Sequence, residues 1–98
     1  MTSNPPYSVR TTAAFDRAAR KLRRAHPKEF PEQYARAIVT LGNDPYNRSR
    51  HYDIRKLEGV APGDGQYRLR LGRFRFRYDI AGQTVWLVAC GIRREDTY

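Results

Sequence analysis

The sequence predicts an α+β domain in which an N-terminal strand and a two-helix antiparallel hairpin precede a three-stranded antiparallel meander packed on the helices. Two segments near the N-terminus have apolar residues at helical spacing, which indicates amphipathic helices. The segment 67–78 alternates apolar and cationic residues around one glycine, and an apolar run follows at 84–90. Strict alternation indicates a strand with one buried face. With 98 residues, the chain is predicted to form one small domain over 1–98.

The first elements are predicted to be a short strand at 7–10 and a helix. Thr12 is a favoured N-cap residue, and the His-Pro pair at 26–27 would end the helix because the residue before a proline disfavours helical geometry. Apolar residues recur in between at Phe15, Ala18, Ala19, Leu22 and Ala25. The opposite face is basic and includes Arg20 and Arg24, which could contact phosphate, although a solvated helix face is the commoner explanation.

A second helix is predicted to start near Pro31, because proline is favoured in the first turn, and to end at Gly42. Its apolar stripe would consist of Tyr34, Ile38 and Leu41. The polar segment 43–53 is expected to be a loop, and residues 54–57 a short turn beneath the sheet. The two helices would then form an antiparallel hairpin with a short connection.

The segment 67–78 is predicted to be a β-hairpin. A two-residue connection with glycine first, Gly72-Arg73, suits a type II′ turn and fixes the register of both strands. The opposed pairs would be Leu71 with Phe74, Arg70 with Arg75, Leu69 with Phe76, and Arg68 with Arg77. One face of the hairpin is then apolar, and the other carries four arginines. The three strands of the meander would be 66–72, 74–80 and 84–90.

The four opposed arginines favour a function for this hairpin. Directly opposed side chains in a sheet lie about 5 Å apart, and like charges at that distance are destabilising. A bound polyanion would offset the repulsion, so we expect this face to bind one. The alternative is a solvated outer face on which the arginine stems merely cover the sheet.

The charge of the whole chain agrees with an anionic partner. Nineteen basic and ten acidic residues give a formal net charge of +9, and only three of the basic residues are lysines. Arginine suits bidentate contact with phosphate, so this bias favours nucleic acid. An acidic protein is a second class of partner, and charge alone does not separate the two.

The remaining composition excludes several classes of protein. The single cysteine, Cys90, rules out an internal disulfide and is expected to be a small buried residue of an apolar strand. The run 84–90 is too short to span a membrane, and the N-terminus has no signal-peptide character. Two separated histidines and one cysteine are a weak basis for a metal site. We therefore expect a cytoplasmic protein that uses no metal or cofactor.

The hairpin 67–78 occurs together with Lys-Leu-Glu-Gly at 56–59 and Gly-Ile-Arg-Arg-Glu-Asp-Thr-Tyr at 91–98. This combination resembles the RelE/ParE toxin superfamily of bacterial type II toxin–antitoxin systems. The predicted helical hairpin also fits, so the resemblance covers nearly the whole chain and implies a RelE-like fold. RelE-like members cut messenger RNA on the ribosome, whereas ParE-like members poison DNA gyrase and usually lack the basic sheet residues and the C-terminal Arg and Tyr.

The resemblance favours the RelE side, because the site residues of that branch have counterparts here. Arg68 and Arg70 match two sheet positions that are often lysine in RelE, and Arg75 matches the arginine of the next strand. Arg93 and Tyr98 match the C-terminal pair. The implied protein is a ribosome-dependent mRNA endonuclease that an acidic antitoxin neutralises. Further RNA contacts are expected from Arg73, Arg77, Arg94, Arg20 and Arg24.

These residues suit some steps of RNA cleavage better than others. Metal-independent cleavage needs a base for the 2′-hydroxyl, cations around the phosphorane, and an acid for the leaving 5′-oxygen. Arginines stabilise the phosphorane but transfer protons badly, because their pKa lies above about 12. Tyr98 is the leading candidate for the base, with stacking on an RNA base or a frayed chain end as its alternatives. Asp53 is a second candidate base.

Two other functions stay open on the sequence alone. A gyrase poison would be an inhibitor and not an enzyme, and it would tolerate the loss of Arg93 and Tyr98. A non-catalytic nucleic-acid-binding module would need only the four arginines of the hairpin, with no residue acting in proton transfer.

Overall fold

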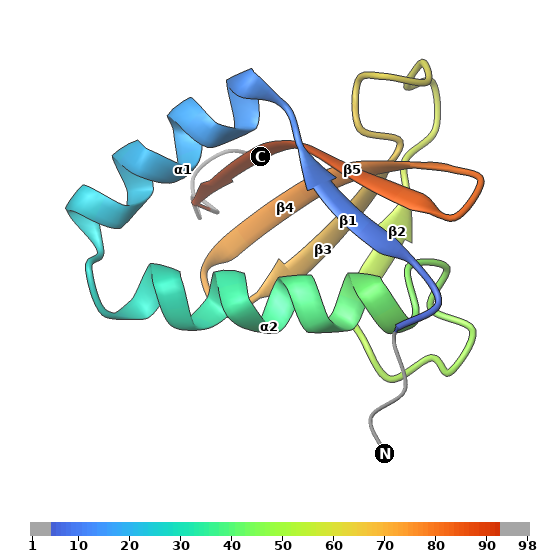
Figure 1. Ribbon diagram of the computed structural model, residues 1–98, viewed down its shortest axis with the longest axis horizontal. Coiled ribbons are helices and arrows are strands. Elements are labelled where there is room, and N and C mark those ends of the chain that lie inside the picture. Colours follow the sequence, from blue (N-terminus) through green and yellow to red (C-terminus); the bar gives the residue numbers. More distant parts are fainter. Residues whose placement is uncertain (1–4, 93–98) are drawn as a thin grey trace.

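Two helices and a five-stranded sheet make up the part of the chain that the computed structural model describes, residues 5–92 (Figure 1). The elements are, in order, β1 (Ser8–Thr11), α1 (Ala13–Ala25), α2 (Glu29–Asn43), β2 (Ile54–Lys56), β3 (Tyr67–Leu71), β4 (Phe74–Ala81) and β5 (Thr84–Ile92). The predicted α+β class is confirmed, and the sheet contains more strands than the three of the predicted meander.

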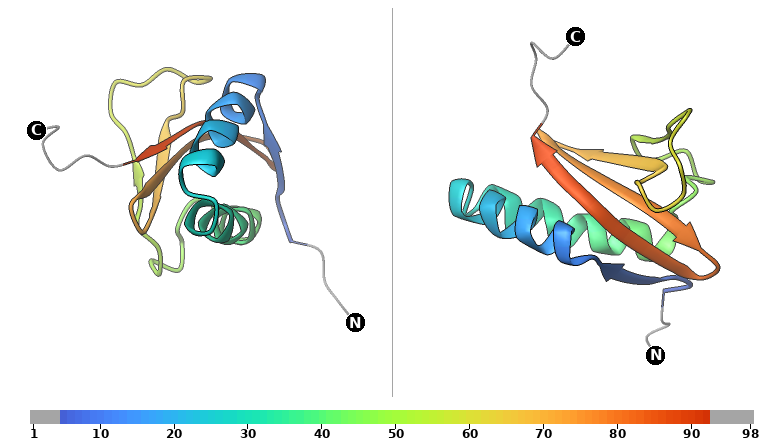
Figure 2. Two further views of the ribbon diagram at one scale, coloured as in Figure 1. Left: turned by 90° about the vertical axis from the view of Figure 1, so that its left-hand side faces the viewer. Right: turned by 90° about the horizontal axis from the view of Figure 1, so that it is seen from above.

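The strands lie in the order β1-β5-β4-β3-β2, so the N-terminal strand adjoins the last strand of the chain. β1 runs parallel to β5, and all other neighbours are antiparallel. Both helices lie against one face of the sheet, as the turned views show (Figure 2). The core between the two layers includes the fully buried side chains Phe15, Phe30, Leu41, Leu69, Phe74, Phe76 and Tyr78. Within the described residues, no helix covers the opposite face of the sheet.

The β3–β4 hairpin has the predicted turn and register. Gly72 has a φ of 59°, which the first central position of a type II′ turn requires. The predicted pairs are all present, from Leu71 with Phe74 to Arg68 with Arg77. Successive side chains of a strand point to opposite faces. Since the apolar residues of the hairpin are buried under the helices, its arginines face away from them.

The boundaries of α1 also agree with the prediction. The side chain of Thr12 accepts a hydrogen bond from the amide of Phe15 at 3.1 Å, which satisfies one of the free amides at the helix start. At the other end, the amide of His26 donates to the carbonyl of Leu22 at 2.8 Å. The helix ends there, directly before Pro27, as the sequence indicates.

α2 is longer than predicted at both ends. It begins at Glu29, two residues before Pro31, because the first amides of a helix have no intrahelical acceptor and a proline among them costs no helical hydrogen bond. Gly42 does not end the helix but lies buried in its last turn. A Cβ added there would meet the Cβ of Pro5 at 3.3 Å, so glycine permits the close approach of the N-terminal segment.

The turn expected at 54–57 is wrong, because residues Ile54–Lys56 form the edge strand β2. Arg55 of this strand lies opposite Arg68, and Ile54 lies opposite Leu69. Three residues are too few to show an alternating pattern, and charged residues are common on edge strands because they discourage pairing with other chains. The extra strand places one more arginine on the outer face of the sheet.

Candidate nucleic-acid interface

The sheet face turned away from the helices carries arginines from three adjacent strands. Arg55 on β2 lies opposite Arg68 on β3, and Arg70 on β3 lies opposite Arg75 on β4. We call these four residues the cationic face. The alternation in the sequence places the three hairpin arginines there, whereas Arg55 was missed because β2 was missed.

Asp53 brings a negative charge to the cationic face. Its Oδ1 lies 2.9 Å from the Nη2 of Arg68, and its Oδ2 lies 3.6 Å from the Nε of Arg70. The backbone supports this position, because the carbonyl of Asp53 accepts a hydrogen bond from the amide of Arg70 at 2.9 Å. The carboxylate therefore spans two guanidiniums, as a phosphate group would. Its side chain is 48% exposed, so solvent and ligands reach it.

The pKa of Arg68 depends on its burial and on the charged groups around it. Burial lowers the pKa of its guanidinium from the ordinary value. The charge of Asp53 opposes that shift, and the other three arginines of the cationic face add to it. The group still stays charged at any working pH, so the cationic face keeps its like charges there.

Two buried donors on this face make no hydrogen bond within the described part of the chain. They are the Nε atoms of Arg68 and Arg70, and for Arg70 the carboxylate of Asp53, at 3.6 Å, lies just beyond hydrogen-bond length. Buried donors are normally satisfied, and ionised oxygens are their strongest acceptors. A phosphate lying on the cationic face would supply such oxygens.

Arg77, the last of the four opposed arginines, serves a different purpose in this structure. Its Nε and Nη2 donate to the carbonyl of Gly65 at 3.2 and 3.0 Å. A Cβ on Gly65 would lie 2.9 Å from the Cβ of Arg77 and from Cγ2 of Val88, and its φ is 83°, so only glycine fits. Arg77 therefore fastens the loop 57–66 to the sheet.

A buried carboxylate completes the attachment of that loop. Asp79 on β4 is 8% exposed and accepts hydrogen bonds from the amides of Gly65 and Gln66 at 2.9 and 3.0 Å. Sequence reasoning missed this residue. A lone aspartate in an otherwise apolar and basic strand was the available signal, because buried carboxylates are rare unless they are paired.

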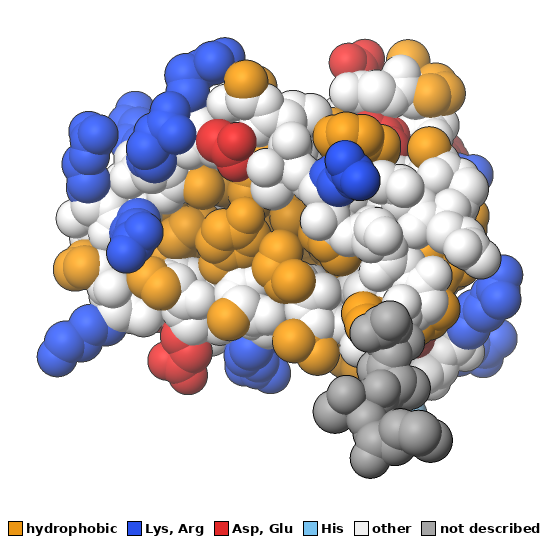
Figure 3. Space-filling view, viewed as in Figure 1, with side chains coloured by type: hydrophobic (Ala, Val, Ile, Leu, Met, Phe, Trp, Pro, Cys, Tyr) orange, Lys and Arg blue, Asp and Glu red, His pale blue; other side chains and the backbone are white. Residues whose placement is uncertain are grey.

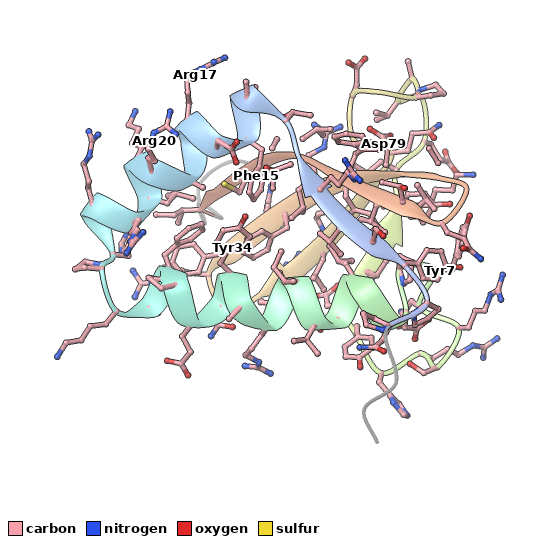
Figure 4. The ribbon with its side chains drawn as sticks, viewed as in Figure 1. Tyr7, Phe15, Arg17, Arg20, Tyr34 and Asp79 are labelled. Carbon is pink, nitrogen blue, oxygen red and sulfur yellow. The ribbon has the colours of Figure 1, made fainter. Side chains whose placement is uncertain are left out.

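The remaining predicted RNA contacts lie elsewhere. Arg73, in the hairpin turn, forms an ion pair of 2.9 Å with Glu29 at the start of α2. Arg20 and Arg24 lie on α1, which covers the other face of the sheet, so the fold does not bring them to the cationic face. Figure 4 shows Arg20 there. Arg93, Arg94 and Tyr98 lie outside the described residues.

A small cavity of about 230 Å³ adjoins the cationic face at the end of β5. Arg75 and Arg77 line it from β4, and Gly91 and Ile92 line it from β5. Ile92 is also the last residue that the structure describes.

A second hollow lies on the helical side of the molecule. An apolar groove of about 530 Å³ runs between α1 and α2, and Figure 3 shows it as a hydrophobic patch bordered by basic side chains. Tyr34 lies between the helices, whereas Arg17 points outward from α1 (Figure 4). Ile38, which the sequence assigned to a buried stripe, lines this groove and is 36% exposed.

The described residues give little support to a metal site, a cysteine nucleophile or a membrane-spanning helix. No group of three or more His, Cys, Asp or Glu is placed to hold a metal ion within 5–92. Burial raises the pKa of the Cys90 thiol to about 11, so it stays protonated near neutral pH and is a poor nucleophile. Of the two helices described, neither is long and apolar enough to cross a membrane.

Comparisons with known proteins agree with this geometry at the level of the fold. No protein-family model and no curated protein gives a significant match. Several solved structures are similar, and three of them are described here. The toxin–antitoxin complex RelBE2 from Mycobacterium tuberculosis matches with a TM-score of 0.69 and 24% identity, covering 90% of this chain and 99% of the other.

Two archaeal structures show the same likeness. The RelE–RelB complex from Pyrococcus horikoshii matches with a TM-score of 0.61 and 25% identity over 92% of this chain and 98% of the other. The RelB–RelE antitoxin–toxin complex from Methanococcus jannaschii matches with a TM-score of 0.56 and 17% identity over 85% and 88%. The chain therefore has a RelE-like fold.

Proposed function

We propose that this protein is the toxin of a type II toxin–antitoxin system and that it cleaves messenger RNA on the ribosome. The observation that carries the proposal is the convergence of Arg68, Arg70 and Arg75 on the sheet face that neither described helix covers. The structural similarity to chains of RelE–RelB complexes supports it. A domain with no anionic ligand gains nothing from crowding like charges in this way.

In the proposed reaction, the 2′-oxygen of one nucleotide attacks the adjacent phosphorus, and the bond from phosphorus to the 5′-oxygen breaks. The product ends are a cyclic 2′,3′-phosphate and a 5′-hydroxyl. Negative charge builds up on the non-bridging oxygens of the phosphorane. Arg68, Arg70 and Arg75 stabilise that charge as fixed cations, a role that needs no proton transfer.

The two proton transfers need other groups. The proton of the 2′-hydroxyl goes to a base, and the leaving 5′-oxygen takes up a proton from an acid. We assign the base to Tyr98, because guanidiniums close to a tyrosine would favour its phenolate form. Arg93 would bind the phosphate beside it. Asp53 remains the alternative base, since its carboxylate is 2.9 Å from Arg68 on the same face.

The proposed partner of the toxin is an acidic antitoxin. Its most apt docking site is the groove between α1 and α2, which combines an apolar floor with Arg20 and Arg23 on its rim. An amphipathic antitoxin segment would place apolar side chains in the groove and acidic ones against these arginines. This use explains basic residues on α1 that do not reach the cationic face.

Two alternative functions make different predictions. A gyrase poison would stop growth through DNA supercoiling and would leave messenger RNA intact. A non-catalytic nucleic-acid-binding module would bind RNA without cleaving it. Transient expression in growing bacteria, with translation and supercoiling measured side by side, separates these functions.

The direct test of the proposal is single-turnover cleavage of ribosome-bound messenger by Arg75→Ala. We expect cleavage to fall by at least about a hundredfold, because one charge that stabilises the phosphorane is lost. Arg17→Ala removes an equal charge from the exposed side of α1 and should cleave at the wild-type rate. A fall in the melting temperature of Arg75→Ala that matches its loss of cleavage would reassign this arginine to the fold.

The same assay tests Tyr98. If its hydroxyl is the base, Tyr98→Phe should lose about 10²–10⁴-fold in rate while still binding ribosomes. If the ring only stacks on an RNA base, Phe should retain most activity and deletion of the residue should lose it. Equal rates in wild type, Tyr98→Phe and the deletion variant would remove Tyr98 from the mechanism.

A further inference from the structure

The loop that joins α2 to β2 has an unusual composition for a connection. Residues 46–52 read Tyr-Asn-Arg-Ser-Arg-His-Tyr, so the stretch contains cationic and aromatic residues but no acidic or aliphatic one. We call it the 46–52 loop (Figure 1). The side chains of both arginines, both tyrosines and His51 are exposed. Interleaved basic and aromatic side chains are what single-stranded nucleic acid binds, through phosphate contact and base stacking.

The loop is held in one shape by Asn47 within it and by Asp44 just before it. The carboxylate of Asp44 accepts hydrogen bonds from the amides of Arg48 and Ser49 at 2.8 and 3.1 Å, and from the hydroxyl of Ser49 at 2.6 Å. The side chain of Asn47 donates to the carbonyl of Tyr52 at 2.9 Å and accepts from its amide at 3.1 Å. These bonds use the short side chains and the backbone, and the side chains of Arg48, Arg50 and Tyr52 remain exposed.

The backbone dihedral angles of the loop also indicate that its surroundings hold it in one conformation. Asn47 and Arg50 have φ values of 56° and 61°, in the left-handed region. Asparagine tolerates this conformation, but an arginine there costs on the order of 1 kcal/mol and persists only where the surroundings enforce it. Arg50 forms no ion pair within residues 5–92, so the fold gains no salt bridge from its side chain.

The loop is also fixed to the core. The hydroxyl of the buried Tyr78 donates to the carbonyl of Pro45 at 2.6 Å. The ring of Tyr46 packs edge-on against the rings of Tyr7 and Tyr67, with centroids 6.3 and 6.0 Å apart. A ligand bound to the loop would therefore meet a preorganised surface and would not have to order a mobile one.

The aromatic rings of the loop contact neighbouring side chains of the loop. The guanidinium of Arg48 lies 5.2 Å from the centroid of the Tyr46 ring, which itself is 42% exposed. The rings of His51 and Tyr52 lie edge to face with centroids 6.4 Å apart. Tyr52 is 36% exposed, and its backbone makes the bonds to Asn47, so its ring is available to a ligand.

The loop leads directly into the cationic face. Tyr52 precedes Asp53, whose carboxylate bridges Arg68 and Arg70, and β2 then supplies Arg55. An RNA strand held by the sheet arginines could thus cross the edge strand β2 and continue onto the loop, where Arg48 and Arg50 supply further cations.

We propose that the 46–52 loop is a second RNA-binding surface, on which Arg48 and Arg50 contact phosphates and Tyr52 stacks on an unpaired base. The inference rests on the proposed function, because it takes the ligand of the cationic face to be RNA. It adds a specific path: the strand enters or leaves the cleavage site across β2. The loop acts in binding and positioning, not in the chemical step.

The test uses binding and not cleavage, so its result does not depend on whether the protein is a nuclease. The probe is a fluorescein-labelled single strand of about twelve 2′-O-methyl nucleotides, whose blocked 2′-oxygens prevent cleavage. The double variant Arg48→Gln/Arg50→Gln should bind at least about tenfold more weakly at 0.1 M salt. The slope of log K against log salt, which is negative, should become shallower by about 1.4, since two phosphate contacts are lost.

A matched control removes the same charge from the helical side. The variant Arg17→Gln/Arg36→Gln changes two exposed arginines on α1 and α2 and should bind within about twofold of wild type, with little change in slope. Tyr52→Phe should bind as wild type does, whereas Tyr52→Ala should lose about tenfold, because stacking uses the ring and not the hydroxyl.

Several outcomes would overturn the inference. Equal losses in the loop variant and in the helix variant would mean that only the net charge matters. Full affinity in Tyr52→Ala would remove the stacking role. Unchanged RNA binding in the loop variant, together with weaker binding of an acidic peptide, would assign the loop to a protein partner. Urea unfolding of each variant checks that the fold is intact.

Discussion

At the scale of single residues, Asp53 is the most informative position on the cationic face. Its carboxylate lies 2.9 Å from one guanidinium and 3.6 Å from another. In the free protein it offsets part of the repulsion among the arginines. When a phosphate arrives, the same carboxylate becomes a competitor for those arginines, unless it takes the proton of the 2′-hydroxyl.

Replacing Asp53 by asparagine separates these roles. Asp53→Asn should bind the non-cleavable RNA strand more tightly, because a competing negative charge is lost and both guanidiniums become available. The slope of log K against log salt should become steeper by about 0.7, equivalent to one more phosphate contact. Since we assign the base to Tyr98, the cleavage rate at saturating enzyme should change little.

Glu32→Gln is the matched control, because it removes one negative charge from the exposed side of α2 and should leave RNA binding unchanged. Tighter binding of Asp53→Asn combined with a loss of about 10²–10⁴-fold in cleavage would transfer the role of base from Tyr98 to Asp53. Weaker binding would contradict both roles and make Asp53 a structural residue.

At the scale of elements, the hairpin was predictable to the residue because three signals coincide in it. The alternation predicts which side chains share a face, Gly72 predicts the type of turn, and the turn fixes the register of the two strands. The segment 54–57 carries none of these signals, so β2 was missed, and Arg55 and the partners of Asp53 were missed with it. α2 was misjudged for a related reason: Pro31 and Gly42 are usual near helix ends, but here both lie inside the helix.

The site could be predicted only as far as local pattern extends. The positions of the hairpin arginines on the outer face follow from strand periodicity. In contrast, Arg77 and Asp79 bond to Gly65, which lies 12 and 14 positions away in the sequence. The sequence does not show that a loop folds back over a strand. It also could not separate exposed from buried stripe positions on α2, because Ile38 looks like a core residue until the groove beside it is seen.

The attachment of the loop 57–66 provides a prediction at this scale. Asp79→Asn keeps the shape of the side chain but leaves one of the two loop amides facing an NH₂ group, so a buried donor loses its acceptor. We expect the free energy of unfolding, measured in urea, to fall by about 1–3 kcal/mol. The loop should also become more sensitive to limited proteolysis than the rest of the domain.

Asp64→Asn is the control for that measurement, since Asp64 is an exposed residue of the same loop. It should change the stability by less than about 0.5 kcal/mol. Equal stability of Asp79→Asn and the wild-type protein would show that the carboxylate contributes nothing beyond its shape.

At the scale of the whole molecule, the two sides of the sheet have separate tasks. The helical side holds the core and the apolar groove, and the outer side holds the cationic face and its extension onto the 46–52 loop. With a net charge of +9, the whole protein attracts polyanions, and the arrangement of the arginines decides where they bind. The dependence of RNA affinity on salt concentration measures how many local phosphate contacts add to this general attraction.

The final prediction follows from the number of phosphate contacts. Arg68, Arg70 and Arg75 on the sheet and Arg48 and Arg50 on the loop would make five contacts with a single strand. Each releases condensed counterions, so log K should fall against log salt with a slope of about −3.5. Between about 50 and 200 mM salt, this slope lowers the affinity for the 2′-O-methyl strand about a hundredfold. If only the three sheet arginines take part, the slope should be about −2 and the loss about twentyfold. A nearly flat dependence would mean that the strand is bound through apolar contacts and that the cationic face serves another partner.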